Sequence, residues 1–350
     1  MPIKPVEPVE GAGLEEPTPD TGPAPKRRRR WLRWTLAVTA AFLTLLSGTA
    51  LYIAYIWQPS ATHYDSPYMA QIESRYVDTP VATFHYTKTG QGSPVVLIAG
   101  GGMWVYSYRN NIRALTKDHT VYAVDLPGQG YTTLKQRGFD YSLDAMSGAL
   151  SSFLDAVGLQ RSALVGHSWG GAWSLYFTER HPERVSRLIL IDSTGLDIPS
   201  TWDWRPLEFP VVGELIGKLM TKDSAAGVLG KAFAKPGSIT PQTVDEDWAP
   251  MSRPENRRAL WMSQRNLDYS VTQNLMGQVH APTLILWGGS DRFDKPSEAA
   301  DMAQRIPGAT ADVLPGCGHN AHEECPDQAN PLMAGFCGPV EGETTARRRE

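Results

Sequence analysis

The segment Gly166-His167-Ser168-Trp169-Gly170-Gly171 decides the fold. It follows the apolar run SALVG (162–166), typical of a buried strand, and it opens a helix predicted over 169–180. A strand-to-helix turn this sharp crowds the backbone, so small residues must flank its tip, and glycine stands two positions either side of Ser168. The turn lifts the serine hydroxyl above the sheet at the positive end of the helix. The sequence therefore predicts that Ser168 is a nucleophile.

Strand-like and helix-like segments alternate on both sides of this turn, which predicts a mostly parallel, doubly wound α/β sheet. Between 195 and 280 the alternation stops, and that stretch is rich in tryptophan and proline. We expect it to form a helical lid inserted into a core made of residues 81–194 and 281–337. The predicted strands are 81–87, 94–100, 120–125, 162–166, 187–192, 283–288 and 309–315, and the predicted helices are 107–116, 143–157, 169–180, 296–305 and 327–336.

A serine hydroxyl needs a base, and the base needs an orienting carboxylate. Two segments directly after predicted strands supply them: WGGSDRFDKP (287–296) holds Asp291, and GCGHNAHEECP (316–326) holds His319. The carboxyl ends of parallel strands meet at one edge of a sheet, so both segments should reach Ser168. Asp294 and Asp192 are alternatives to Asp291 as the acid. His322 is expected to lie near the site without being the base, and His167 to serve local packing.

These motifs resemble the α/β-hydrolase family, in its serine hydrolase branch. The loop Asp125-Leu-Pro-Gly-Gln-Gly130 is similar to the D-x-P-G-x-G loop of that family, and the resemblance covers nearly all of 81–337. It implies that Ser168 is the nucleophile, Asp291 the acid and His319 the base.

The resemblance also implies an oxyanion hole made of two backbone N–H groups. One should belong to Trp169, directly after the nucleophile. The other should lie in the loop after strand 94–100, where family members often have His-Gly and this chain has Ala99-Gly-Gly-Gly102. We expect Gly101 to donate there, with Gly102 as the next choice.

The function that the resemblance implies is hydrolysis of an ester-type bond in an apolar small molecule, with no cofactor and no metal. The aromatic side chains of Trp104, Tyr106 and Tyr108 either line an acyl pocket or pack in the core, and the same two placements are open for the lid tryptophans. Together these aromatics favour an apolar substrate. One alternative is an aminopeptidase similar to proline iminopeptidases, which needs lid carboxylates for a substrate ammonium group. Asp203, Glu208 and Glu214 are candidates for that role. Another alternative is a non-catalytic ligand-binding protein on the same scaffold.

The charge balance and the cysteine count limit the partners and metal sites that the chain can have. The 350 residues include 33 Lys+Arg and 37 Asp+Glu, a net charge of −4, which argues against a nucleic-acid partner. Three cysteines exclude a four-cysteine zinc site. If the catalytic part lies outside the cell, the sequence allows one disulfide and leaves open whether it forms. Cys317 and Cys325 are the favoured pair, because Cys325 and Cys337 flank a predicted helix roughly 15 Å long, too far apart for a bond.

Residues 34–57 contain no charged side chain, and as a helix they are about 36 Å long, enough to cross a bilayer. Tryptophan and tyrosine stand at both ends, and a basic run precedes the segment. These features predict a single-pass anchor in the cell membrane, with a cytoplasmic N-terminus and an extracytoplasmic catalytic domain. We expect 1–33 and 338–350 to be disordered tails and 58–80 to be a linker.

Overall fold

The computed structural model describes residues 26–60, 64 and 66–338. The chain divides into two units, Met1–Thr49 and Ala50–Glu350. Most of both predicted tails lies outside the described residues. The prediction for 26–33 is wrong, however, because these residues already belong to a helix. Arginine is a good helix former, so the basic run extends the apolar helix toward the N-terminus.

Helix α1 runs from Lys26 to Tyr55, so it begins before the predicted 34–57 segment and ends two residues short of it. Within its Arg30–Tyr55 portion, the most apolar stretch of 18 residues has a mean hydropathy of 1.8, and none of that stretch is buried. By length and composition, this one helix is apolar enough to cross a membrane.

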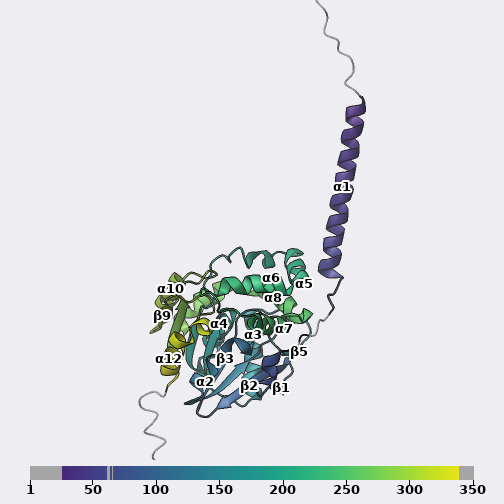
Figure 1. The fold of residues 1–350 in the computed structure, drawn as a ribbon. Coiled ribbons are helices and arrows are strands. Elements are labelled where there is room, and N and C mark those ends of the chain that lie inside the picture. The colour runs from purple at the N-terminus through teal and green to yellow at the C-terminus, as the bar shows by residue number, and fades with distance from the viewer. Residues whose placement is uncertain (1–25, 61–63, 65, 339–350) are drawn as a thin grey trace, which may run out of the picture. The chain divides into compact units, whose positions relative to one another are not determined.

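One sheet holds nine strands in the order β1-β2-β4-β3-β6-β7-β8-β9, with β5 paired to β2 (Figure 1). The strands from β3 to β9, apart from β5, pair in parallel, and β1, β2 and β5 pair antiparallel. The mostly parallel sheet is therefore confirmed. The strands are β1 Arg75–Asp78, β2 Ala82–Gly90, β3 Ser93–Ile98, β4 His119–Val124, β5 Thr133–Leu134, β6 Ser162–His167, β7 Val185–Ile191, β8 Thr283–Gly288 and β9 Thr310–Leu314.

Helices cover both faces of this sheet. Successive residues of its central strands point to opposite sides, and the apolar side chains on each side are buried under helices. Val96 and Ile98 of β3 pack with α3, α4 and α10, while Val95 and Leu97 pack with α2, α11 and α12. These helices are α2 Ile112–Leu115, α3 Leu143–Ala156, α4 Trp169–Arg180, α10 Ser297–Arg305, α11 Ala321–Glu324 and α12 Pro326–Cys337.

Two predictions about local structure are wrong. The predicted linker 58–80 includes strand β1, which pairs with β2 and so belongs to the sheet. The predicted helix 107–116 is broken into the 3-10 helix η2 (Val105–Tyr108) and α2. Tertiary bonds hold the break: the Tyr108 hydroxyl donates to the carbonyl of Ile98, and the Asn111 amide donates to the carbonyl of His322.

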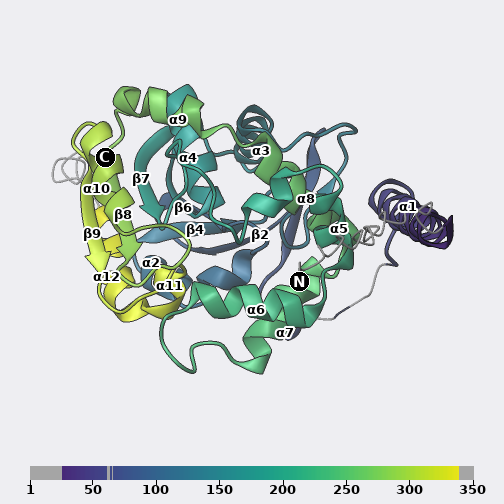
Figure 2. The same cartoon turned by 90° about the horizontal axis from the view of Figure 1, so that it is seen from above.

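The predicted lid is helical, as expected. Figure 1 draws α5, α6 and α8 above the sheet, and Figure 2 shows the same helices from above. The lid elements are η4 Arg205–Glu208, α5 Val212–Leu219, α6 Lys222–Ala232, α7 Pro241–Met251, α8 Pro254–Asn266, α9 Tyr269–Leu275 and η5 Met276–Gln278.

The loop after β4 is fixed by the fully buried carboxylate of Asp125. One of its oxygens accepts from the N–H of Val105 at 2.9 Å. The other accepts from the N–H of Tyr131 at 3.0 Å and lies 2.6 Å from Nδ1 of His85. Ser74 contacts the second ring nitrogen of His85 at 3.0 Å. Asp125 thus ties β2, β4 and the loop after β3 together.

We predict that Asp125→Ala lowers the free energy of unfolding by about 3 kcal/mol, because it leaves several buried donors without an acceptor. Urea denaturation of the chain in mild detergent, followed by tryptophan fluorescence, measures this. The exposed ion pair of Asp78 with Lys135 offers a control, and Asp78→Ala should leave the free energy of unfolding nearly unchanged. Equal effects of the two substitutions would contradict the role given to Asp125.

Candidate active site

Ser168 sits at the tip of the turn between β6 and α4 with φ 51°, a left-handed conformation rare for residues other than glycine. Such a conformation costs roughly 1–3 kcal/mol, and its surroundings must hold it. A Cβ on Gly166 would lie 2.3 Å from the carbonyl oxygen of Gly170, and one on Gly170 would lie 2.5 Å from that of Ile98. The predicted requirement for glycine on both sides is thus confirmed by close backbone contacts.

Ser168 opens onto a cavity of about 510 Å³ between the lid and the carboxyl edge of the sheet. His319, which follows β9, lines the same cavity. Most of the remaining wall is apolar and comes from the lid, with Met103 contributed by the core. The main apolar lid residues are Trp204, Leu207, Ile216, Met220, Leu229, Trp248, Met251 and Leu260.

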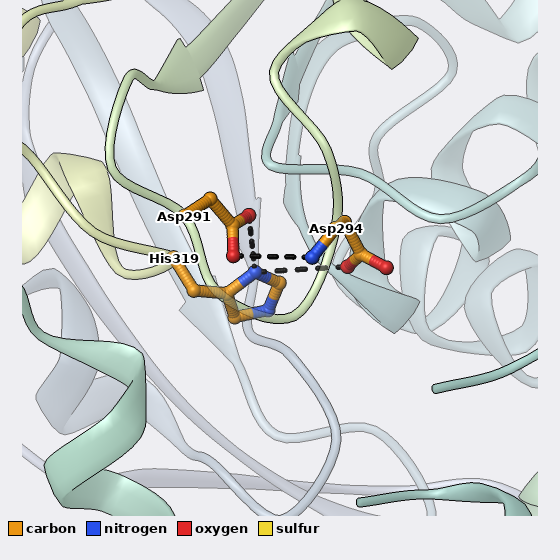
Figure 3. A group of neighbouring side chains, drawn as sticks. All are labelled: Asp291, Asp294 and His319. Atoms are coloured by element: carbon orange, nitrogen blue, oxygen red, sulfur yellow. Dashed lines mark hydrogen bonds and ion pairs between the residues drawn. The ribbon is translucent and has the colours of Figure 1, made fainter. Parts of the chain in front are cut away.

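His319 is held by the acid loop after β8. Its Nδ1 lies 2.8 Å from Oδ2 of Asp291 and 3.7 Å from Oδ2 of Asp294, and Figure 3 shows both carboxylates approaching that one nitrogen. The other oxygen of Asp291 accepts from the N–H groups of Phe293 and Asp294, which fixes the carboxylate. Asp291 therefore makes the direct bond, and Asp294 is a second charge nearby.

These three side chains also place one ligand atom each within 4.8 Å of one another, a spacing that a cation can use. The ring nitrogen that such an ion needs is already bonded to Asp291. The arrangement thus favours a proton on Nδ1, which leaves Nε2 free to accept a proton.

Burial and charge set the ionisation of the group. Burial alone would lower the pKa of His319, but the charge and hydrogen bond of Asp291, with Asp294 and Asp192 nearby, raise it to about 9. Burial raises the pKa of Asp294 to about 7, although the neighbouring histidine opposes this. The cluster therefore stabilises a positive charge on His319.

Asp192, the other alternative acid, serves a different purpose. It is fully buried at the end of β7, and burial together with the charge of Asp291 raises its pKa well above the usual range. One oxygen accepts from the N–H of Gly288 at 2.6 Å, and the other from that of Ala321 at 3.2 Å. Asp192 thus joins the acid loop to the histidine loop, whereas Nδ1 of His319 is bonded to Asp291.

Two further histidines surround His319 and are buried with it. Burial, with His322 and His319 nearby, lowers the pKa of His167 well below its usual range. Burial, with Arg109 and His319 nearby, lowers the pKa of His322 to about 3. Both rings remain neutral near pH 7, so His319 is the member of this cluster that takes up a proton. His167 contacts the carbonyl of His319 through Nε2 at 3.0 Å.

The loop after β3 is positioned by Gln129 of the D-x-P-G-x-G motif. Its Nε2 donates to the carbonyls of Ala99 and Gly100, both at 2.8 Å, and the N–H of Met103 also donates to Gly100. Because the peptide between Gly100 and Gly101 is trans, holding this carbonyl turns the N–H of Gly101 to the opposite side.

Gly101 packs directly against Trp169. A Cβ there would lie 2.3 Å from the indole ring of Trp169, so the contact requires glycine. The N–H of Trp169 is at the first position of α4, where helix geometry leaves N–H groups without an intrahelical partner. Gly101, Gly102 and Trp169 all line the cavity beside Ser168.

Two placements, pocket and core, were open for the aromatic residues after β3. Trp104, Tyr106 and Tyr108 are buried in the core on one face of the sheet and are not part of the cavity wall, so the core placement is the one observed. Their loop folds down onto α11, which Tyr108 contacts through the ring of His322. Of the lid tryptophans, Trp204 and Trp248 line the cavity, Trp261 packs in the core, and Trp202 is exposed.

Sequence reasoning missed Phe293 and Glu324. The ring of Phe293 packs edge-on against His319, with centroids 5.2 Å apart. Glu324 accepts from the N–H of Gly318 and from the N–H groups of Ala234 and Lys235, so it joins the lid to the histidine loop. An acidic residue beside a helix and an aromatic in a loop are too common in sequences to indicate these roles.

A disulfide closes the histidine loop. It joins Cys317 and Cys325, the expected pair, whose Cα atoms are 6.1 Å apart, while Cys337 is free and buried. The linked residues lie on either side of His319. The disulfide and Glu324 therefore restrict the same short loop.

Comparison with known proteins agrees with this geometry. The model of the "Alpha/beta hydrolase family" matches residues 95–331. A 2-hydroxy-6-oxononadienedioate/2-hydroxy-6-oxononatrienedioate hydrolase of Comamonas testosteroni is 30% identical over 266 residues, covering 72% of this chain and 90% of that protein.

Solved structures show the same fold. A meta-cleavage product hydrolase from Pseudomonas fluorescens aligns with a TM-score of 0.67 and 22% identity, covering 75% of this chain and 96% of that one. A carboxylesterase from Bacillus subtilis aligns with a TM-score of 0.65 and 20% sequence identity, covering 84% of this chain and 96% of that one. With the family model matched over most of the core, the chain belongs to the alpha/beta hydrolase family, as its motifs predict.

Proposed function

We propose that this chain is a membrane-anchored serine hydrolase that cleaves ester-type bonds of an apolar small molecule through an acyl-enzyme on Ser168. One observation carries the proposal. Ser168, in a strained turn, shares a largely apolar cavity with His319, and Nδ1 of that histidine is bonded to Asp291.

In the proposed reaction, Oγ of Ser168 attacks the acyl carbonyl carbon while Nε2 of His319 takes the hydroxyl proton. Asp291 holds the ring with Nδ1 protonated and stabilises the imidazolium that forms. The same proton then passes to the leaving alcohol, and a water molecule, deprotonated by His319, releases the acid from Ser168. No cofactor enters these steps.

The proposed oxyanion hole consists of the N–H groups of Gly101 and Trp169. Two observations support it: Gln129 fixes the Gly100–Gly101 peptide, and the Trp169 N–H stands at the start of α4. Preorganised donors of this kind stabilise the negative oxygen of the tetrahedral intermediate without reorganising during the reaction.

The charge of the cavity wall supports a neutral substrate. Five acidic residues line it, namely Asp203, Asp247, Asp294, Glu298 and Asp301, against Lys295 as the one lysine or arginine among the described lining residues. The peptide N–H of Lys295 donates to Glu298. Lys231 pairs with Asp203, and burial raises the pKa of Asp247 well above its usual range, so the wall carries little net charge and an uncharged ester meets mainly apolar side chains.

A second candidate reaction is hydrolysis of a carbon–carbon bond beside a ketone. It is favoured by the 30% identity to a 2-hydroxy-6-oxononadienedioate hydrolase, because a compound of that name has no ester or amide bond to cleave. The mainly apolar wall of the cavity counts against a dianionic substrate of this kind, so we place ester hydrolysis first.

The contacts of the lid carboxylates count against the aminopeptidase alternative. Glu214 forms a bidentate pair with Arg265, Asp203 pairs with Lys231, and Glu208 accepts from Gln264. An ammonium group of a substrate would have to displace one of these partners.

We further propose that α1 anchors the chain, with the N-terminus cytoplasmic and residues after Trp57 outside. The basic run before the span and the aromatic residues at both ends support this orientation. The Cys317–Cys325 disulfide supports an oxidising compartment for the catalytic part.

We predict that a fluorophosphonate probe labels the chain in detergent micelles and that Ser168→Ala abolishes the labelling. Ser200 lines the same cavity, so Ser200→Ala is the matched control and should label normally. Labelling is read by in-gel fluorescence and located by peptide mass spectrometry. A folded wild-type chain that takes no label would favour the ligand-binding alternative. A panel of aryl esters, amino-acid arylamides and the 6-oxo dienedioate then separates the remaining reactions.

We predict that kcat/KM for a neutral aryl ester rises with pH until His319 is deprotonated, near pH 9. Removal of the Asp294 charge destabilises the imidazolium, so Asp294→Asn should lower the pKa of His319 and move this rise to lower pH by about one unit. Asp301→Asn, also in the cavity wall, is the control and should leave the profile in place. An unmoved rise in Asp294→Asn would assign the profile to another group.

We predict that Gln129→Met lowers kcat by roughly tenfold or more with little change in KM, because the Gly101 N–H loses its fixed direction. Steady-state kinetics on the aryl ester measure both constants, and the melting temperature shows whether the fold is retained. A raised KM with an unchanged kcat would show that Gln129 shapes the binding site instead.

A further inference from the structure

The lid carries most of the exposed apolar side chains of the globular part. Among described residues after Trp57, eleven large hydrophobic side chains are exposed, and eight of them lie between 195 and 280. Soluble proteins rarely gather such side chains without a partner for them.

Helix α5 shows this most clearly. Val212, Ile216 and Leu219 follow the i, i+4, i+7 spacing of one helix face, and they are 43%, 38% and 54% exposed. The opposite face is firmly packed: a Cβ on Gly217 would lie 2.3 Å from the ring of Trp261 in α8. The salt bridge between Glu214 and Arg265 fixes the same two helices together. The exposed face therefore belongs to a well-held helix.

The exposed apolar surface is continuous with the cavity. Ile198, Ile216 and Val228 are exposed to solvent and also line the cavity that holds Ser168. These three side chains place apolar surface at the rim of the cavity, between the outside of the lid and the interior that holds Ser168. A substrate that avoids water therefore meets apolar side chains at this rim.

The same helix contacts the end of α1. The Nζ of Lys218, whose side chain is buried, donates to the carbonyls of Ile53 at 3.1 Å and Trp57 at 2.6 Å. These carbonyls belong to the last turn of the helix and to the second residue after its end, where a lysine satisfies groups that lack an intrahelical partner. Ala54, in the same turn, is only 3% exposed. The place where the chain leaves its span is thus fixed beside α5.

We infer that the exposed face of α5 and the adjoining lid lie in the bilayer surface, and that the substrate is an acyl ester dissolved in the membrane, which enters the cavity directly from the lipid. This inference rests on the proposed membrane anchor and ester hydrolysis. An apolar helix face held beside the exit of a span lies at the depth where interfacial helices bury their apolar side chains.

The test uses the full chain in phosphatidylcholine vesicles. An environment-sensitive fluorophore is attached at Leu219→Cys, with Val313→Cys as the matched control, since Val313 is similarly exposed on β9. Labelling without reductant leaves the disulfide intact, and Cys337 is buried. The probe at 219 should shift its emission to shorter wavelength and be quenched by brominated lipid, while the probe at 313 should do neither. A water-exposed spectrum at 219 in vesicles would overturn the inference. A shift that appears in detergent and grows with protein concentration would overturn it too, in favour of a second copy of the chain.

A kinetic experiment tests whether the substrate enters from the bilayer or from water. Leu219→Asp and Val212→Asp should lower hydrolysis of a long-chain ester in the vesicles by about tenfold, because a charge opposes burial in lipid. Both should leave a water-soluble butyrate ester within about twofold of wild type, as should Val313→Asp for either ester. Equal rates of the wild type and Leu219→Asp on the long-chain ester would contradict entry from the bilayer. Failure of the wild type on both esters would instead refute ester hydrolysis, and the fluorophore would still report membrane contact.

Discussion

The site depends on a contact between backbones. Gly170, in the first turn of α4, approaches the carbonyl oxygens of Ile98 and Ala99 so closely that a methyl group does not fit. This contact sets α4 against the end of β3 and brings the start of the helix to the loop that carries Gly101. The left-handed φ of Ser168 is then the conformation that connects β6 to a helix in that place. Removing the contact would separate the proposed nucleophile from the proposed oxyanion donors at once.

Near this contact, three buried histidines that have the same ordinary pKa differ in the carboxylates that surround them. Three carboxyl groups, those of Asp291, Asp294 and Asp192, surround one end of the cluster and favour a proton on His319. His167 and His322 are buried nearby, and burial keeps them neutral. A positive charge is therefore stable on one ring of the three. The protein reaches this distinction through the placement of carboxylates, since all three rings are equally hidden from water.

The parts of the site that the sequence predicted are those whose chemistry requires particular residues at fixed spacing. Glycines two positions from Ser168, an aspartate after β8 and a histidine after β9 all follow from the backbone path, and the structure brings the latter two into contact. Contacts between distant segments were beyond prediction: Gln129 against Gly100, and Glu324 against the lid, depend on how loops fold over one another. The placement of the aromatic run 104–108 stayed open for the same reason, because aromatic side chains fill cores and pockets alike. Strand β1 was missed because its four mostly exposed residues show no buried pattern.

The disulfide around His319 has a consequence for the life history of the protein. Cys317 and Cys325 lie on either side of the proposed base, so the bond that joins them completes the loop that presents it. Newly made chain that is still in a reducing cytoplasm lacks this bond. If the catalytic part is exported, as we propose, a cell that makes this protein would carry a hydrolase whose final maturation coincides with export. Its own acyl compounds would be exposed to the finished enzyme only after the catalytic part has left the compartment of synthesis.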